Sequence, residues 1–354
     1  PATPAGDDLY RDVLPAWSRA RVAWERAESP QQAQSVAERA NAAVAAATPI
    51  DSGLAEAVAE LTALPRETST RHWYAAVAGV NRAARTASLP YYLDPRVNVR
   101  RTPEGPSRRL RVDSYRVEHI STYTADDAPL AALHVRSFAS ASDGHGLAGI
   151  SRDVQSFALV ALDATEAHAK DLAQLATEGR CGLSFEPDRA ALLERCGALL
   201  AIEAEHAPTA VVAEVERHEL QHQLDGPLLR LAPALRTRLV GVSEHSRSQV
   251  NRELSAYLAQ LTHPHPGVKL GLVLPLRFAL LQRGVYHHAA VLMFEALARA
   301  LAPEVGELDV ATLATVSAAL ATLHDAGLRR VAGQAWEASF GDALPTLTAN
   351  TLAP

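Results

Sequence analysis

The residues whose types and spacing could do chemistry are His218-Glu219-Leu220-Gln221-His222, which follow the pattern H-E-x-x-H. On a helix, residues four apart lie one turn apart on the same face, so both imidazoles could bind one metal ion. Glu219 would lie about 60° around the helix from His222. From there its carboxylate would not bind the ion but could reach a water on it. Zinc lowers the pKa of such a water, and Glu219 would take its proton as a general base.

The residues around this motif predict the helix that positions it. Thr209 is expected as the N-cap, and Gly226-Pro227 as the stop. Val211 and Val215 fall on the same stripe as the two histidines. Two imidazoles on an apolar stripe would be costly without a polar partner. We therefore favour metal binding over a solvated helix that matches the motif by chance.

A catalytic zinc site needs a third protein ligand and an open fourth position. Glu253, in "VNRELSAYLAQL", is expected in the middle of a later helix, next to its apolar side. Glu244 stands where that helix should begin, which favours a role as a first-turn charge. We favour Glu253 as the ligand over an interfacial salt bridge. Glu244 and His245 stay as alternatives.

Taken together, the H-E-x-x-H helix and a second helix with a glutamate, small residues and an aromatic resemble the zincin metallopeptidases of gluzincin type. The likeness covers Thr209 to Leu261. The metzincin pattern would need Gly at 225 and His or Asp at 228, where the chain has Asp225 and Leu228. A thermolysin-like spacing would place the glutamate near 242, where the chain has Val242. The narrower family is therefore left open.

The resemblance implies a zincin-like core, Zn²⁺ held by His218, His222 and Glu253, and a peptide or protein as substrate. It also implies a hydroxyl or imidazole that stabilises the oxyanion, for which Tyr257 is the first candidate and core packing the alternative. His145 and His245 are further candidates for the same role.

Two other features are interpreted through the same resemblance. Asp225, one turn beyond His222, could orient an imidazole or simply cap the helix. The predicted strand "PLAALHVRSFAS" at 129–140 would be the edge strand to which an extended peptide adds.

The hydrophobic patterns predict a mainly α protein with a small antiparallel β-sheet (α+β). Strands are expected in "RRLRVDSYRVEHISTYT", in "PLAALHVRSFAS" after the turn-rich "ADDAP", and in "SFALVALD". Prolines accumulate between 90 and 106, where the helical period stops. We therefore expect an N-terminal helical region, a linker or extended crossing, a zincin-like core with the sheet and both site helices, and a C-terminal helical region, at 1–89, 90–106, 107–262 and 263–354.

Composition narrows the class of partner. Among 354 residues, 21% are charged and the net charge is -6, which gives no indication of a nucleic-acid surface. No apolar run is long enough for a transmembrane helix, which needs about 18 residues. The opening "PATPAGDD" would suit an exported protein (periplasmic, lipid-anchored or secreted), slightly favoured over a cytoplasmic one, although an artificial start looks the same. Cys181 and Cys196 fit either a disulfide or two free thiols.

Three functions follow from these residues. The first is a zinc metallopeptidase, and the second is a zinc hydrolase of a non-peptide amide. The third is a binding or scaffold protein whose metal is structural or absent. Glu219 argues against the third, because a structural zinc site has no use for that carboxylate.

Overall fold

The structure is a computed structural model, and it describes all residues except 27–28, 103–104, 139–148, 151–156, 179–203, 226–230, 281–283, 303–307, 309 and 351–354. The chain forms two compact units, one of Pro1–His119 with Val135–Gly146, the other of Ile120–His134 with Leu147–Pro354. The predicted boundaries differ from this division, because residues 263–354 share a unit with the motif helix. In the part of the chain that is described, no helix is long and apolar enough to cross a membrane.

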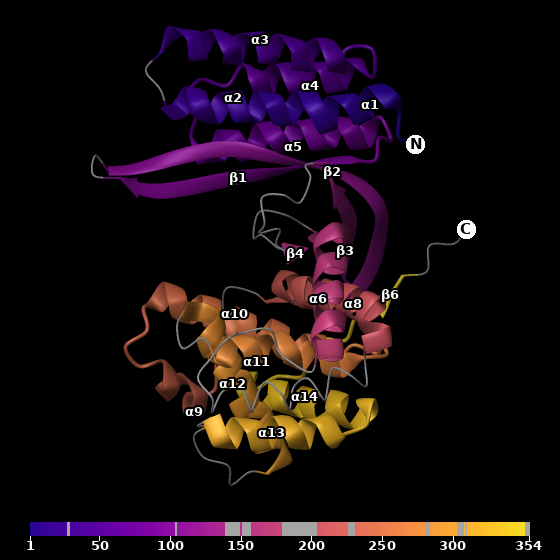
Figure 1. Cartoon of the computed structure of the whole chain (residues 1–354), viewed down its shortest axis with the longest axis vertical. Helices are drawn as coiled ribbons and strands as arrows, with labels where there is room; N and C mark the ends of the chain where they lie inside the picture. The colour runs from indigo at the N-terminus through magenta and orange to yellow at the C-terminus, as the bar shows by residue number, and fades with distance from the viewer. Residues whose placement is uncertain are drawn as a thin grey trace. The chain divides into compact units, whose positions relative to one another are not determined.

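The first unit packs a layer of helices against a long β-hairpin (Figure 1). Ser29, Asp51 and Ser69 cap three of these helices, each accepting a hydrogen bond from the amide three residues later. Trp17 and Trp73 stack in the core with ring centroids 6.0 Å apart. The helices are α1 (Pro4–Asp8), the π-helical η1 (Leu9–Val13), α2 (Leu14–Arg26), α3 (Pro30–Ala47), α4 (Ser52–Thr62) and α5 (Thr70–Thr86).

The segment predicted as a linker or extended crossing contains a strand, β1 (Tyr91–Thr102). It pairs antiparallel with β2 (Gly105–Ala125) from Tyr91↔Arg116 to Thr102↔Gly105. Leu93 is fully buried in the helical layer. Pro95 is tolerated within β1 because, among the described strands, β1 has a neighbour on only one side. The buried residues of β1 run without alternation from Tyr91 to Asp94, so the segment lacks the period-2 pattern that predicts a strand.

The sheet continues into the second unit through the end of β2, β3 (Ala128–Ser137), β5 (Ala158–Ala161) and β4 (Gly149–Ile150), while β6 (Thr348–Ala349) pairs with β2. Asp126 and Asp127 have positive φ angles of 46° and 65°, as a two-residue hairpin turn requires. The prediction of a purely antiparallel sheet is wrong, because the sheet is mixed. The hairpin of β2 and β3 and the pairs β4–β5 and β2–β6 are antiparallel, so β3–β5 is the parallel pair. The connection 138–157 is long enough for such a crossover.

The rest of the second unit is helical, so the prediction of a mainly helical chain with a small sheet is confirmed (Figure 1). One hydrophobic core joins α8, α10, α12 and α14, with Val250, Leu254, Phe294 and Trp336 among its members. On the sheet side, Leu220 of α8 packs against β3 and β5. The helical elements are α6 (Leu162–Glu178), η3 (Ala204–His206), α8 (Ala207–Leu224), α9 (Pro233–Arg236), η4 (Thr237–Leu239), α10 (Glu244–Gln260), η5 (Val268–Leu272), α11 (Val273–Leu280), α12 (Gly284–Leu301), α13 (Val310–Thr322) and α14 (Asp325–Phe340).

Candidate metal centre

The motif lies on α8, which begins at Ala207, three residues earlier than an N-cap at Thr209 predicts. Thr209 is not the N-cap: its hydroxyl donates to the carbonyl of His206 from inside the first turn, at 3.1 Å. Pro208 suits the first turn because its fixed φ is helical and its missing N–H would have no partner there. The helix ends at Leu224, immediately before the predicted stop. Gly226 and Pro227 themselves lie outside the described residues.

The second ligand helix is α10, and its register places Glu253 in its middle. Ser243 caps the helix by accepting a hydrogen bond from the amide of Ser246 at 3.2 Å. Glu244 is exposed in the first turn, as predicted, and His245 beside it is exposed too. α10 packs against α8, so the side chains of Glu253 and the two histidines face one another.

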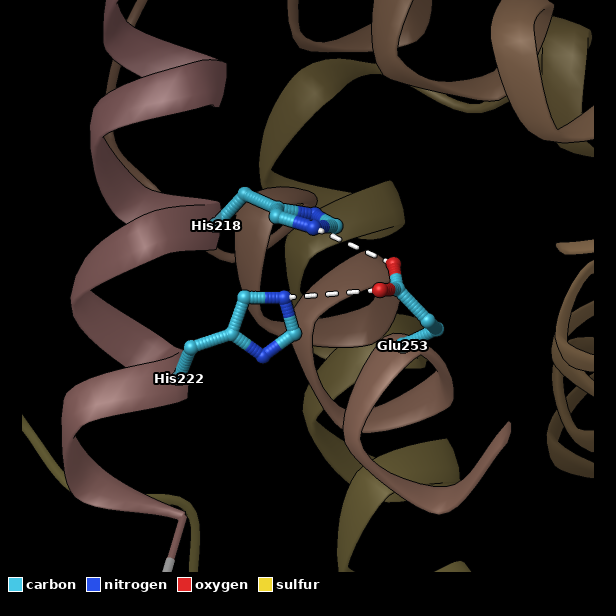
Figure 2. Close-up of side chains that lie close together, drawn as sticks. All are labelled: His218, His222 and Glu253. Carbon is cyan, nitrogen blue, oxygen red and sulfur yellow. Dashed lines mark ion pairs between the residues drawn. The ribbon is translucent and has the colours of Figure 1, made fainter. Parts of the chain in front are cut away.

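His218, His222 and Glu253 converge on one point (Figure 2). The Nε2 atoms of His218 and His222 lie 3.5 Å and 3.8 Å from the two carboxylate oxygens of Glu253. One ligand atom from each residue lies within 4.8 Å of the others. A tetrahedral zinc ion with bonds of about 2.0–2.1 Å holds its ligand atoms about 3.4 Å apart. Two imidazoles and a carboxylate at these separations therefore fit a zinc ion by donor type and by spacing.

The two imidazoles differ in their affinity for a proton. Burial, the neighbouring His218 and Arg252 lower the pKa of His222 well below its usual range, so this ring is neutral with a free lone pair. Burial acts in the same direction on His218, but the carboxylate of Glu253 outweighs it and raises the pKa of His218. A metal ion would therefore bind His222 directly and would displace a proton from between His218 and Glu253.

Gln260, which the sequence gave no reason to single out, contacts the site from the last turn of α10. Its Oε1 lies 3.1 Å from Nδ1 of His218, and its Nε2 donates to the carbonyl of Gly271 at 3.0 Å. A glutamine seven residues beyond Glu253 lies on the same side of the helix after two turns. That spacing is the signal that could have identified it.

Glu219, the predicted base, is buried beside the ligands. Burial is the main cause that raises its pKa to about 7; nearby His218 opposes this rise and Glu253 adds to it. Gly149 of β4 packs directly against it: a Cβ added there would lie 2.5 Å from Cγ and 2.6 Å from Oε1 of Glu219. A glycine is therefore needed where this strand passes the carboxylate.

Two tyrosines lie near the ligands. The ring of Tyr257 packs 5.3 Å from that of His218, and only 3% of the residue is exposed. Tyr286, which was not predicted, is 48% exposed and stacks on Phe278 at 5.2 Å. Partial burial and then the charges of Glu253 and Glu219 raise the pKa of Tyr286. Tyr257 thus has the contacts of a packing residue, whereas Tyr286 is within reach of a bound molecule.

Asp225 ties the end of α8 to two other helices. It accepts hydrogen bonds from Nε2 of Gln221 at 2.7 Å and from the hydroxyl of Ser255 at 2.9 Å. Ser255 in turn accepts one from the indole of Trp336 on α14 at 3.0 Å. Burial is the main cause that raises the pKa of Asp225 to about 6. These bonds go to α10 and α14, so Asp225 fixes the helix that carries the histidines rather than a ring itself.

A second buried polar cluster ties α8 to the sheet. Glu216 accepts a hydrogen bond from the hydroxyl of Tyr123 at 2.7 Å, and its other oxygen lies 3.4 Å from Nε2 of His134. The hydroxyl of Ser121 lies 3.2 Å from that same nitrogen. A charge-relay triad needs its serine and its acid on opposite imidazole nitrogens. This cluster therefore anchors the helix and is not a second catalytic centre.

The remaining predictions have mixed outcomes. The strand at 129–140 is not an edge strand, because β3 lies between β2 and β5, and β4 ends the described strand order. His145, Cys181 and Cys196 lie outside the described residues. Within the part that is described, the three residues at 218, 222 and 253 form the one group of this kind that could hold a metal, without Glu244 or His245.

Comparison of the chain with protein-family models, with curated proteins and with solved structures finds no match.

Proposed function

We propose that the protein is a zinc-dependent metallopeptidase in which His218, His222 and Glu253 hold the ion and Glu219 is the general base. The observation that carries the proposal is the convergence of ligand atoms from these three side chains within 4.8 Å, with the buried carboxylate of Glu219 as a fourth side chain, directly after His218 on the same helix. A purely structural site would use a fourth protein ligand instead and would need no such base.

The roles divide among residues already placed. Zinc, when bound, supplies a Lewis acid that polarises a carbonyl and lowers the pKa of a water. Glu219 accepts the proton of the attacking water and can return it to the leaving amine. Gly149 leaves the Glu219 carboxylate the room it needs in that position. Tyr286 is the better candidate than Tyr257 for a hydrogen bond to the substrate, because its ring is accessible.

The substrate of the proposed enzyme is an extended peptide or a protein segment. β4 ends the described strand order and runs beside the proposed base. A peptide that adds to such a strand by main-chain hydrogen bonds would bring its carbonyls past the proposed ligands. A non-peptide amide substrate is the alternative within the same chemistry.

The test starts with the zinc content of the purified protein. We expect about one zinc per chain, lost or strongly weakened in His222→Ala and Glu253→Ala. His245→Ala, at an exposed position in the first turn of α10, is the matched control and should keep its zinc. Wild type that binds no zinc after metal is added back would refute the proposal.

The second test separates catalysis from binding. Glu219→Gln should keep its zinc and lose at least about 10²–10⁴-fold in hydrolysis of a mixed peptide library, because the general base is gone. Turnover at the wild-type rate in this variant would refute the role of Glu219. Hydrolysis of amide-linked non-peptide compounds but of no peptide would favour the alternative.

A further inference from the structure

We propose that Gln260 is a positioning residue that fixes the proton of His218 on Nδ1 and so directs an unprotonated Nε2 at Glu253. The inference deepens the proposed function, because it states how one proposed ligand is prepared for a metal. It concerns the protein's own hydrogen bonds, however, and can be tested without any metal.

The orientation of the Gln260 amide follows from its second partner. One polar atom of this amide lies 3.0 Å from the carbonyl oxygen of Gly271. A carbonyl oxygen can only accept a hydrogen bond, so that atom must be the amide nitrogen. The amide oxygen is then the atom 3.1 Å from Nδ1 of His218. An oxygen can only accept there, so Nδ1 must carry the hydrogen. In a neutral imidazole the lone pair is then on Nε2.

Gly271 is itself held in place by α8. Its amide hydrogen-bonds to the buried carboxyl group of Glu214, four residues before His218 on the same face of the helix. A Cβ at position 271 would lie 3.0 Å from Oε1 of Glu214 and 2.9 Å from the side chain of Leu261. The polar contacts thus run from Glu214 through Gly271 and Gln260 to His218, starting and ending on α8. This closed circuit leaves Gln260 no freedom to turn its amide around.

The other histidine lacks such an arrangement. Nδ1 of His222 is buried and has no hydrogen-bond partner among the described atoms. Nδ1 of His218, by contrast, faces an oxygen whose position is set by the contact of Gln260 with Gly271. Gln260 can therefore select the tautomer of His218. Hydrogen bonds of this kind typically change metal affinity or activity by about 10–100-fold when they are removed.

The experiment uses the full chain without metal, labelled with ¹⁵N-histidine, and raises the pH until the nitrogen chemical shifts of the histidines stop changing, so that the rings are neutral. Nitrogen chemical shifts distinguish the two tautomers, and comparison with His218→Gln assigns the signal. We expect the Nδ1–H form for His218 in the wild type. The Nε2–H form would overturn the inference, whatever the protein does with zinc.

Two variants of Gln260 then distinguish the effect of its hydrogen-bond acceptor from the effect of its side-chain size. Gln260→Leu removes the acceptor and should lose the Nδ1–H preference and about 10–100-fold in zinc affinity, measured by chelator competition. Gln260→Glu keeps an acceptor for Nδ1 but loses the donor to the Gly271 carbonyl, so it should keep the tautomer and bind zinc more tightly than Gln260→Leu. Thr262→Val is the control, because it removes a side-chain hydrogen bond near the end of α10 that does not involve His218.

The outcomes distinguish this inference from the proposed function. Gln260→Leu with wild-type tautomer and affinity, or Gln260→Glu as weak as Gln260→Leu, would overturn the role of Gln260 while leaving the zinc site intact. The expected tautomer in a protein that binds no zinc would support the hydrogen-bond circuit and refute the metallopeptidase.

Discussion

Each of the two units holds a group of buried or partly buried ionisable side chains, and the two groups are completed in different ways. In the first unit, Arg21 donates from its three nitrogens to Glu25 and to the carbonyls of Leu64 and Pro65, at 2.8–3.1 Å. The second oxygen of Glu25 accepts from the amide of Leu110 at 3.0 Å. All of these distances are those of ordinary hydrogen bonds. The protein itself supplies every partner that this pair needs.

In the second unit, His218, His222 and Glu253 face one another at 3.5 Å and 3.8 Å. These distances are too long for good hydrogen bonds, which lie at about 2.7–3.2 Å, yet they suit a shared tetrahedral ion. Buried polar groups that satisfy one another hold a fold together. Side-chain ligand atoms that lie close together, yet too far apart for good hydrogen bonds, are the pattern of a set of metal ligands. The following changes test that distinction, from the largest expected effect to the smallest.

Arg21→Met should destabilise the first unit by about 3–5 kcal/mol, because it leaves the carboxylate of Glu25 buried without its ion pair. Urea unfolding followed by circular dichroism measures the change. Arg11→Met is the control: its ion pair with Asp7 spans 3.8 Å with half of the Arg11 side chain exposed, so its loss should cost less than about 1 kcal/mol. Equal effects of both variants would contradict the structural role of the Arg21 pair.

Gly149→Ala should lower turnover about 10–100-fold with unchanged zinc affinity, because the new methyl group displaces the carboxylate of Glu219. Steady-state kinetics and chelator competition on the same preparation measure the two quantities. Gly333→Ala on α14 is the matched control, since a Cβ there meets nothing within 4 Å. An active Gly149→Ala enzyme would show that the approach of β4 to Glu219 is not needed.

Asp225→Asn should change the dependence of stability on pH. The pKa of Asp225 is about 6 in the fold against an ordinary 3.8, so from about pH 4 to about pH 6 the folded state keeps a proton that the unfolded state has lost. Wild-type stability therefore falls as pH rises through this range, and the asparagine variant lacks this contribution. Relative to wild type, we expect the variant to gain about 1–2 kcal/mol between about pH 4.5 and about pH 7. Urea unfolding measures the difference in unfolding free energy between the variant and wild type. The same difference at both pH values would contradict the raised pKa of Asp225.

Glu253→Gln should change the stability of the metal-free protein by less than about 1 kcal/mol, because glutamine keeps an acceptor beside the histidines and removes a buried charge. Urea unfolding in the presence of a chelator measures it. A loss as large as that of Arg21→Met would mean that Glu253 completes a structural ion pair, and the contrast between the two groups would disappear.

The sequence was informative where the signal is local. The period of α8 predicted that both motif histidines face one way, and the position of Glu253 in its helix predicted a side chain directed at them. The strand β1 was missed because it contains a proline and its first residues are all buried, which leaves no alternation to find, and the burial of Leu93 becomes visible only with the helical layer in place. Gly149 was missed because its role depends on a contact with Glu219, which is far from it in the chain. Gln260 lies two turns after Glu253 on the same side of its helix, but its contact with His218 joins two helices and is not visible in the sequence.

The core shared by α8, α10, α12 and α14 has a consequence for how zinc would relate to stability. The two helices that carry the proposed ligands are packed by apolar side chains that do not involve the site, so these residues would be arranged before any ion arrives. In small zinc domains, by contrast, metal binding and folding are one event. Here zinc would act as an ordinary ligand of a folded protein and stabilise it only by mass action. The melting temperature of the protein would then rise with the logarithm of the free zinc concentration. The stability of the fold would therefore report how much zinc is available.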